Sequence, residues 1–362
     1  MSKVLILGPA YLDSFANNIK AGLNDLGIES TVLSPFGASF RSESLFAYTK
    51  TGAVLTEIIN RTNLLRRELI DKYISRQLSK FDPILVISVW SNFSSNQVEQ
   101  WRILTPKAKW VFWYPDAIVN LGSHQVLISP YDHFFFKEPY IVEKLSSRTN
   151  LNIHFLAEGC NPKIHKTEKP LNDEEINYYK CDLAVAGNIY PYRTLIMQDL
   201  PQDIHINFYG NRSQQLPREL NKFKNAIKCD YVAGRTKAVA FKLAKINLNT
   251  MHYGEIRGVN VRLFEATACG GFVLSHSGPE ISRYFEPGKE IVTFESISDL
   301  RGAVEHYLHA DEERNKIAIA GQERSQKDHT FKIRLSELLR ICELNEILPH
   351  ERNDNKNREK LI

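Results

Sequence analysis

Short apolar runs alternate with longer amphipathic stretches through the first half of the chain. The stretch Asp13–Leu26 repeats apolar residues at helical spacing and ends before Gly27, so it predicts a helix with a glycine C-cap. A longer helix is expected over Thr56–Leu78. The apolar runs predict buried strands at Val4–Leu7, Ser30–Leu33, Ile84–Val89, Trp110–Tyr114, His133–Phe136 and Asn152–Leu156. Strands that alternate with helices favour a parallel sheet covered on both faces.

The alternation breaks at Glu158–Pro170, a polar connector that contains proline, and then restarts. The second half predicts strands at Leu183–Ala186, Ile206–Tyr209, Ala244–Leu248, Phe272–Ser275 and Glu290–Phe294. We therefore expect an α/β protein with two doubly wound, Rossmann-like domains that face each other across a cleft. The expected units are an N-terminal domain over 1–160, a C-terminal domain over 161–330, a helix over 331–349 that packs back toward the N-terminal domain, and a disordered polar tail over 350–362.

Composition narrows the class of protein. The chain has 362 residues, which suits two domains, and its surplus of basic over acidic residues is only 46 − 42 = 4, too small to require nucleic acid as a partner. No apolar run approaches the ~18 residues of a membrane span, and Gly8-Pro9 interrupts the first run too early for a signal peptide. Five cysteines without a C-x-x-C pair fit a reducing compartment and a chain without structural zinc. These features predict a cytoplasmic protein.

The segment Gly258–Ser275 carries the clearest chemical pattern. It predicts a glycine-led turn, a short helix, a double-glycine C-cap and a buried strand. Glu265 lies in that helix among small and apolar neighbours, so its carboxylate is expected to be exposed, paired with a cation or directed at a ligand. It would suit the two hydroxyls of a ribose, and a salt bridge with Arg262 is the alternative. The preceding loop, Gly254–Gly258, would let backbone N–H groups approach phosphates.

The chain contains the motif Asn247-x-Asn249-x-x-His252, followed by Gly258-Val259-Asn260-x-Arg262-x-Phe264-Glu265-Ala266-x-Ala268-Cys269-Gly270. This pattern closely resembles that of the CgeB-type glycosyltransferases, a branch of the GT-B fold with a C-terminal domain like that of group 1 glycosyltransferases. It continues through Phe285–Val292, Arg324, His329-Thr330 and Arg334, and upstream through Asp182–Asn188 and Arg193. The N-terminal half resembles the family only loosely.

The resemblance implies transfer of a sugar from a nucleoside-diphosphate sugar, most commonly a uridine one, to a glycan, lipid-linked or protein acceptor. The C-terminal domain would hold the donor and the N-terminal domain the acceptor. Glu265 matches the second glutamate of an E-x7-E motif and would bind the ribose. Arg257 stands at the first position, where it could neutralise a diphosphate, and we carry no catalytic role to it. The expected donor-binding residues are Gly187, Asn188, Tyr190, Arg193, Gly258, Val259, Asn260, Arg262 and Glu265.

Negative charge develops on the phosphate that leaves the sugar. The sequence contains no Asp-x-Asp motif, so we expect cations and helix N-termini, without a metal ion or other cofactor, to stabilise this charge. Gly187 follows a predicted strand and Arg193 lies in the first turns of the next helix, from where it could reach a phosphate. A tight turn with a surface arginine is the alternative. Arg262 is the second candidate cation.

An inverting transferase also needs a base for its acceptor. Asp116 follows the predicted strand Trp110–Tyr114, and the carboxyl ends of parallel strands face the crevice. Asp13 and His124 are alternatives, and each of the three could instead stabilise a turn or a helix end. His252, just before the glycine-rich loop, is the second candidate for a catalytic role, unless it only makes a structural hydrogen bond.

Other classes of function stay open. A nucleotide-sugar epimerase on the same fold would need paired acid and base groups beside the sugar, and a non-catalytic structural protein of the spore-coat type could retain the fold. The basic helix Arg61–Lys80 would suit peripheral contact with the inner face of a membrane, or simply a solvated helix face. An NAD-binding enzyme is disfavoured, because Gly8-Pro9-Ala10 does not fit G-x-G-x-x-G.

Overall fold

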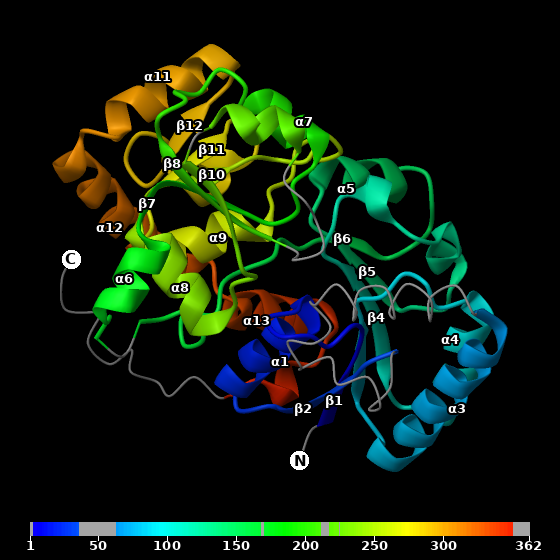
Figure 1. Ribbon diagram of the computed structural model, residues 1–362. Coiled ribbons are helices and arrows are strands. Elements are labelled where there is room, and N and C mark those ends of the chain that lie inside the picture. Colours follow the sequence, from blue (N-terminus) through cyan, green and yellow to red (C-terminus); the bar gives the residue numbers. More distant parts are fainter. Residues whose placement is uncertain (1–2, 36–62, 168–169, 211–216, 224, 350–362) are drawn as a thin grey trace, which may run out of the picture.

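The computed structural model describes residues 3–35, 63–167, 170–210, 217–223 and 225–349. The expected tail over 350–362 and the first residues of the two predicted helices Thr56–Leu78 and Arg61–Lys80 lie outside this range. Figure 1 shows two α/β units, each built around its own sheet, with the carboxyl-terminal helix beside the first helix of the chain.

The first unit has a parallel six-stranded sheet in the order β2-β1-β3-β4-β5-β6. All six strands were predicted and are confirmed, with Leu7 of β1 in register with Ser88 of β3. Their bounds are β1 Lys3–Leu7, β2 Glu29–Leu33, β3 Leu85–Ser88, β4 Lys109–Tyr114, β5 His133–Phe136 and β6 Ile153–Phe155. The strand order reverses between β1 and β3, so the loops after these two strands diverge and leave an opening at the sheet edge.

Helices cover both faces of this sheet. α1 (Phe15–Asp25) begins after Ser14, whose side chain accepts from Asn17 N, and ends before Gly27, whose φ is +72°. The predicted glycine cap is therefore confirmed. The opposite face is covered by α3 Asn63–Phe81, α4 Ser95–Leu104 and α5 Pro139–Ser146, and two short 3-10 helices, η2 Ile118–Asn120 and η3 His124–Ile128, precede β5.

The second unit repeats the architecture. Its parallel six-stranded sheet has the order β12-β11-β10-β7-β8-β9, which reverses between β7 and β10. Five of the strands were predicted, and the edge strand β9 was missed. The bounds are β7 Cys181–Ala186, β8 His205–Tyr209, β9 Asn225–Cys229, β10 Ala244–Asn249, β11 Val273–His276 and β12 Val292–Phe294.

The helices of the second unit also lie on both faces. α7 Pro191–Ile196 and α11 Ile297–Tyr307 pack on one face, and α8 Gly234–Leu243 and α9 Val261–Ala268 pack on the other. The double glycine after α9 caps it as predicted, with Gly270 at φ +78°. The remaining elements are α6 Asp173–Tyr179, η4 Arg218–Lys222, α10 Ile281–Tyr284, α12 Asp311–Asp328 and η5 Asn345–Ile347.

The chain crosses between the units twice, and the two crossings lie side by side. Cys160 N donates to His329 O and Phe331 N donates to Cys160 O, both at 2.9 Å. After the second crossing, α13 (Phe331–Ile341) packs on α1 and shares its apolar core.

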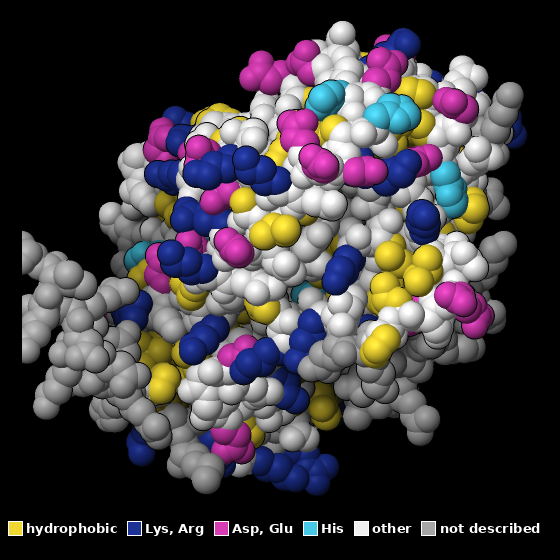
Figure 2. All heavy atoms as spheres, turned by 90° about the vertical axis from the view of Figure 1, so that its left-hand side faces the viewer, with side chains coloured by type: hydrophobic (Ala, Val, Ile, Leu, Met, Phe, Trp, Pro, Cys, Tyr) yellow, Lys and Arg dark blue, Asp and Glu magenta, His cyan; other side chains and the backbone are white. Residues whose placement is uncertain are grey.

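Within the described part of the chain, no helix combines the length and the apolar character that crossing a bilayer requires. On the face in Figure 2, basic and acidic side chains are interspersed over much of the surface.

Candidate functional site

The carboxyl ends of β7 and β10 meet where the strand order of the second sheet reverses, the usual place for a ligand in such a sheet. Gly187 follows β7 with a φ of +96°, and Thr250 follows β10. A β-carbon at position 187 would lie 2.6 Å from Arg262 Nη1. Glycine is therefore required at position 187 for two reasons: the backbone is in the left-handed region, and an arginine side chain lies too close for a β-carbon.

Two arginines from different helices converge on this turn. Arg193 of α7 is buried; its Nε donates to Thr250 Oγ1 at 2.8 Å and its Nη1 donates to Ala186 O at 3.2 Å. Arg262 lies in the first turn of α9, against Gly187. Among the described residues, neither guanidinium pairs with a carboxylate. We call Gly187, Arg193 and Arg262 the arginine site.

The electrostatics of the arginine site favour an anion. Burial and the nearby charge of Arg262 lower the pKa of Arg193 to about 9. At the end of β11, burial and the charge of Arg193 lower the pKa of His276 to about 4, and its Nδ1 accepts from Met251 N at 3.1 Å. Two close guanidinium groups without a carboxylate partner in the described part of the chain suit a phosphate or diphosphate group, to which arginine binds in a bidentate manner.

Aromatic rings border the arginine site. The ring of His252 meets Tyr190 edge-on at 5.1 Å between centroids and lies over Tyr253 at 4.1 Å. His252 Nδ1 accepts from Gly254 N at 3.0 Å, whereas its Nε2 makes no hydrogen bond within the described residues. Asn188 Nδ2 donates to Tyr190 Oη at 3.3 Å. The predicted residues of this loop therefore gather beside the two arginines.

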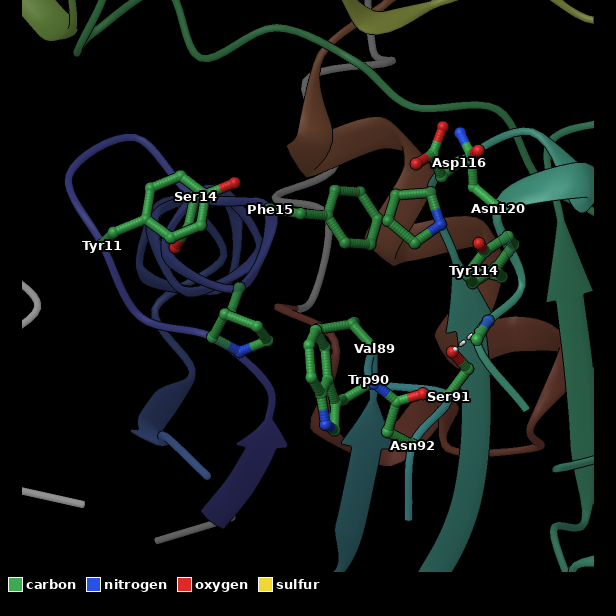
Figure 3. Close-up of a pocket in the computed structure, with 14 residues that line it drawn as sticks. Tyr11, Ser14, Phe15, Val89, Trp90, Ser91, Asn92, Tyr114, Asp116 and Asn120 are labelled. Carbon is green, nitrogen blue, oxygen red and sulfur yellow. Dashed lines mark hydrogen bonds between the residues drawn. The ribbon is translucent and has the colours of Figure 1, made fainter. Parts of the chain in front are cut away.

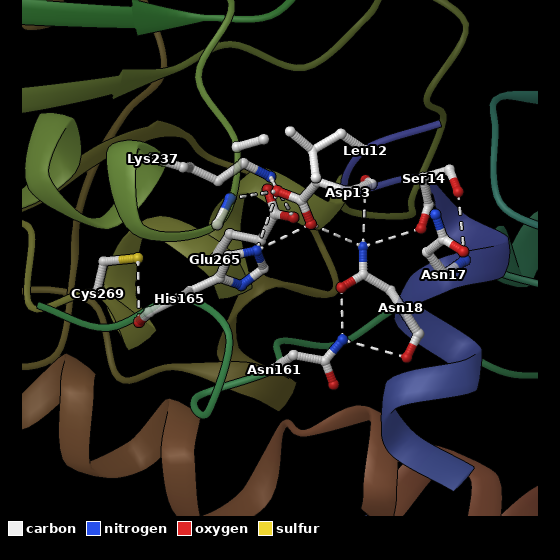
Figure 4. Close-up of polar contacts among 12 residues, drawn as sticks. Leu12, Asp13, Ser14, Asn17, Asn18, Asn161, His165, Lys237, Glu265 and Cys269 are labelled. Atoms are coloured by element: carbon white, nitrogen blue, oxygen red, sulfur yellow. Dashed lines mark hydrogen bonds and ion pairs between the residues drawn. The ribbon is translucent and has the colours of Figure 1, made fainter. Parts of the chain in front are cut away.

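Glu265 lies in a buried ionic cluster formed by both units (Figure 4). It is only 4% exposed, and its Oε1 accepts from Lys237 Nζ of α8 at 2.8 Å. Lys237 also pairs with Asp13, whose Oδ1 lies 2.9 Å from His165 Nε2. The alternative salt bridge between Glu265 and Arg262 is therefore wrong, because α8 supplies the cation and Arg262 lies against Gly187.

Asp13 is held in its charged form within this cluster. Burial alone would raise its pKa, but Lys237 and His165 outweigh burial and keep the pKa well below the ordinary value. The ligand atoms of Asp13, His165 and Glu265 lie within 4.8 Å of one another, a spacing at which three side chains could hold a metal ion. Lys237 Nζ already supplies the positive charge between the two carboxylates. The carboxylate of Asp13, one of the alternative bases, is thus occupied by structural partners.

The glycine-rich loop before α9 gives its backbone donors to the first unit. Glu138 accepts from the N–H groups of Ile256 at 3.0 Å, Arg257 at 3.0 Å and Gly258 at 2.9 Å. These donors were expected to approach phosphates, and the structure gives them to a carboxylate instead. The side chain of Arg257 pairs with Glu280 at 2.7 Å, away from the arginine site.

Two further predicted residues lie behind this loop. Val259 is buried in the apolar core that contains Leu263, and Asn260 is buried with its Nδ2 donating to Thr250 O at 3.3 Å. Both residues therefore fix the start of α9, from which Arg262 projects. Beside them, Lys137 Nζ of the first unit pairs with Glu255 Oε1 at 2.6 Å.

The first unit has its own opening, a pocket of about 300 Å³ lined partly by the loops after β1, β3 and β4 (Figure 3). Asp116 lines it as expected from its place after β4, and its Oδ1 accepts from Ala117 N at 2.7 Å. No contact within the described residues joins Asp116 to His252, the other candidate for a catalytic role. The alternative base His124 begins η3.

Three residues that contact the candidate site were not predicted from the sequence: Lys237, Glu138 and His276. Lys237 and Glu138 act on residues far away in the sequence, at separations of 28 for Lys237 with Glu265 and 118 for Glu138 with Ile256. His276 ends a strand that was predicted, and its place at the carboxyl end of β11 is the one signal that could have found it.

Comparison with known proteins supports the assignment of the fold. Residues 193–340 match the model of a family described as glycosyl transferase-like. No curated protein matches the sequence. Among solved structures, sucrose-phosphate synthase from Thermosynechococcus elongatus is 12% identical with a TM-score of 0.64, over 94% of this chain and 98% of its own.

Two further structures have the same architecture. Anabaena Alr3699/HepE in complex with UDP and glucose is 10% identical with a TM-score of 0.62, over 94% of this chain and all of its own (100%). A glycosyltransferase from Rickettsia africae is 11% identical with a TM-score of 0.61, over 96% of this chain and 98% of its own. The expected pair of doubly wound sheets is confirmed: the chain has the GT-B fold, and its residues 193–340 are similar to a family described as glycosyl transferase-like.

Proposed function

We propose that this protein is a CgeB-type glycosyltransferase that moves a sugar from a nucleoside-diphosphate sugar to a glycan, lipid-linked or protein acceptor without a metal ion. The observation that carries the proposal is the arginine site, where two guanidinium groups meet at a strand-order reversal without a carboxylate partner among the described residues. A diphosphate would supply the negative charge that balances the two guanidinium groups. We place the enzyme in the cytoplasm, with peripheral contact at the inner face of the membrane.

The arrangement can assist each part of the transfer. The acceptor oxygen forms a bond to the anomeric carbon of the sugar, the bond from that carbon to the diphosphate oxygen breaks, and its electron pair leaves with the nucleoside diphosphate. Arg193 and Arg262 stabilise the charge that develops on the leaving group. In an inverting transfer, Asp116 takes the proton of the acceptor hydroxyl.

We assign the remaining donor contacts to the predicted loop residues. Tyr190 and His252 border the arginine site and offer ring faces and His252 Nε2 to the donor. Glu265 meets the ribose hydroxyls with the carboxylate that Lys237 holds in place. Uridine diphosphate is the expected nucleotide, because the Anabaena protein of the same fold was solved with UDP and with UDP-glucose.

The test is calorimetric binding of UDP, GDP, dTDP and CMP in the presence of EDTA. We expect one diphosphate to bind, and Arg262→Ala to weaken it at least about tenfold, since a hydrogen bond to a charged group contributes about 1.5–3 kcal/mol. Arg262 is the better site for substitution because Arg193 also holds Thr250 and Ala186. Arg301→Ala, at an arginine of α11 that is 57% exposed, is the matched control and should bind as wild type.

The outcomes separate the alternatives. Binding that requires added Mg²⁺ contradicts the metal-free site, and absence of binding by every nucleotide favours the structural protein. If a nucleotide sugar binds, nuclear magnetic resonance of the sugar distinguishes the two enzymes. An epimerase changes the donor sugar with no acceptor present, whereas a transferase releases the nucleoside diphosphate when an acceptor is added.

A further inference from the structure

We propose that the pocket of the first unit binds the acceptor, and that the acceptor presents there an uncharged sugar ring. This inference rests on the proposed function, because it names the acceptor class of the same transferase. It excludes acceptors that enter the pocket with a phosphate, sulfate or carboxylate group. Four properties of the pocket lead to it: its position, its border with the second unit, its charge and its lining.

The pocket lies where the strand order of the first sheet reverses. Tyr11 follows β1, Trp90 and Asn92 follow β3, and Asp116 follows β4. Ligands of doubly wound sheets bind at this point. The second sheet has the arginine site at its own reversal, so the pocket and the arginine site lie at corresponding places in the two sheets.

The pocket also borders the second unit. A β-carbon at Gly254 would lie 2.5 Å from a methyl group of Val119, so the loop that follows β10 touches the loop that follows β4. Tyr11 lines the pocket and lies close to the buried cluster, since the charges of Asp13 and Lys237 both act on the pKa of its hydroxyl group. A molecule in the pocket is therefore held beside the unit that carries the donor site.

The charges on the described lining of the pocket disfavour anionic groups. Among the fourteen described residues that line it, Asp116 is the only charged one, and none is Lys, Arg or His. The two lysines buried between the units are neutralised by other partners: Lys137 by Glu255, and Lys237 by Asp13 and Glu265. Among the described residues of the lining, a phosphate or carboxylate would meet one negative charge and no cation.

The lining combines ring faces with planar hydrogen-bonding groups (Figure 3). Tyr11, Trp90 and Tyr114 supply aromatic surface, against which the C–H groups of a sugar ring can pack. Asn92 and Asn120 supply amides that can both donate to and accept from hydroxyl groups. This is the balance of a mostly apolar pocket with a few polar groups that fix the orientation of a small ligand.

The carboxylate of Asp116 is placed to accept from a hydroxyl. Its Oδ1 is held by Ala117 N at 2.7 Å, whereas its Oδ2 has no partner within the described residues. The volume of about 300 Å³ lies at the lower end of small-molecule pockets. One sugar ring at the end of a glycan fits this space, while a longer acceptor continues outside it.

The experiment measures binding of defined sugars to the full chain in the presence of UDP, by saturation-transfer nuclear magnetic resonance. The neutral probes are methyl glucoside, methyl galactoside and N-acetylglucosamine, and the anionic probes are glucuronic acid and glucose 6-phosphate. We expect saturable binding of at least one neutral probe and at least tenfold weaker binding of both anionic ones. Asp116→Asn should narrow the difference in affinity between neutral and anionic probes, because it removes the one negative charge among the described lining residues.

A double variant, Asn92→Ala with Asn120→Ala, tests the site itself. Both side chains are exposed, so the fold should tolerate the change, and we expect sugar binding to fall at least tenfold while UDP affinity, measured by calorimetry, stays as in wild type. Asn24→Ala, at an exposed asparagine of α1 outside the pocket, is the control.

The inference is overturned if an anionic probe binds most tightly, if the double variant binds neutral sugars as wild type, or if UDP binds and no sugar does. In the last case the proposed function stands and the acceptor class is wrong. Failure of UDP to bind the wild-type protein is a failure of the proposed function, and it is read from the calorimetry alone.

Discussion

Glu158 shares one buried cation with a second carboxylate. Lys137 Nζ lies 2.6 Å from Glu255 Oε1 and 3.7 Å from Glu158 Oε2. Burial raises the pKa of Glu158 to about 8, since Lys137 offsets burial only in part and Glu255 adds a further negative charge. One lysine cannot balance two carboxylates, so the more distant one retains its proton near neutral pH.

This predicts how stability depends on pH. The folded protein holds the proton of Glu158 more tightly than the unfolded chain does. The protonated Glu158 therefore contributes fully to the free energy of unfolding below about pH 4.5, and this contribution is lost as the pH rises through about 8. Glu158→Gln, which imitates the protonated form, should therefore raise the free energy of unfolding at pH 8.5 by a few kcal/mol relative to its effect at pH 5. Urea unfolding at the two pH values measures the difference.

The matched control is Glu286→Gln, at a glutamate whose side chain is 61% exposed. Its free energy of unfolding should follow that of the wild type from pH 5 to pH 8.5. Parallel curves for Glu158→Gln and the wild type would show that the buried carboxyl is ionised throughout this range.

The arginine site shows which contacts local sequence can predict. Gly187 directly follows a strand that its apolar run predicted, Arg193 lies in the next helix, and Arg262 lies in a helix bounded by glycines. The partner of Glu265 could not be predicted in the same way. Lys237 lies on a separate helix, and its selection over Arg262 depends on how α8 packs against α9.

At the scale of elements, α1 and α13 approach each other closely at one glycine. A β-carbon at Gly22 would lie 2.6 Å from Leu335 Cδ1 and 2.8 Å from Phe331 Cβ. Gly22→Ala should add up to about 1 kcal/mol of helix propensity but force the helices apart. We expect a net loss of about 1–3 kcal/mol in the free energy of unfolding, measured by urea denaturation.

The variant Gly302→Ala changes helix propensity without changing how a helix packs, so it serves as the control for Gly22→Ala. Gly302 lies in α11 and is exposed, and no atom of the described residues outside its own helix lies within 4 Å of the added β-carbon. This variant should gain up to about 1 kcal/mol, since alanine favours a helix over glycine and nothing is displaced. If both variants gained stability equally, the close approach of α13 to α1 would not be a constraint.

The properties of this element also explain why the strand β9 was not predicted from the sequence. β9, Asn225–Cys229, has no apolar run, its Ile227 is half exposed at 50%, and it lies at the edge of the sheet. An edge strand needs little burial, so its residues carry little of the hydrophobic signal that identified the other strands. The buried strands were predictable because both faces of each are covered by helices.

At the scale of the whole molecule, polar contacts between described residues join the two units. The buried cluster links Asp13 to Lys237, the ion pair of Lys137 with Glu255 crosses between the units, and the carboxylate of Glu138 binds the glycine-rich loop of the second unit. The hydrogen bonds to Glu138 differ from the other contacts, because backbone N–H groups that bind a carboxylate could equally bind another anion. Glu138 therefore controls where this loop lies relative to the first unit.

We predict that Glu138→Ala loosens the two units. The variant leaves the N–H groups of Ile256, Arg257 and Gly258 without their acceptor, and each hydrogen bond to a charged group contributes about 1.5–3 kcal/mol. Unfolding free energy should fall by about 3 kcal/mol, and small-angle X-ray scattering should show a larger radius of gyration. Scattering is the decisive readout, because Glu138 also accepts from Tyr140 N at 3.1 Å, and loss of that contact would lower stability without separating the units.

Glu143→Ala, in the helix α5 that Glu138 caps, is the control. Glu143 meets Arg257 Nη1 at 3.4 Å with its side chain 57% exposed, so this ion pair contributes little. Its radius of gyration should equal that of the wild type. If Glu138→Ala scattered like Glu143→Ala, the remaining contacts alone would fix the arrangement of the two units. The glycine-rich loop would then be free to take up an anion without any change in the shape of the molecule.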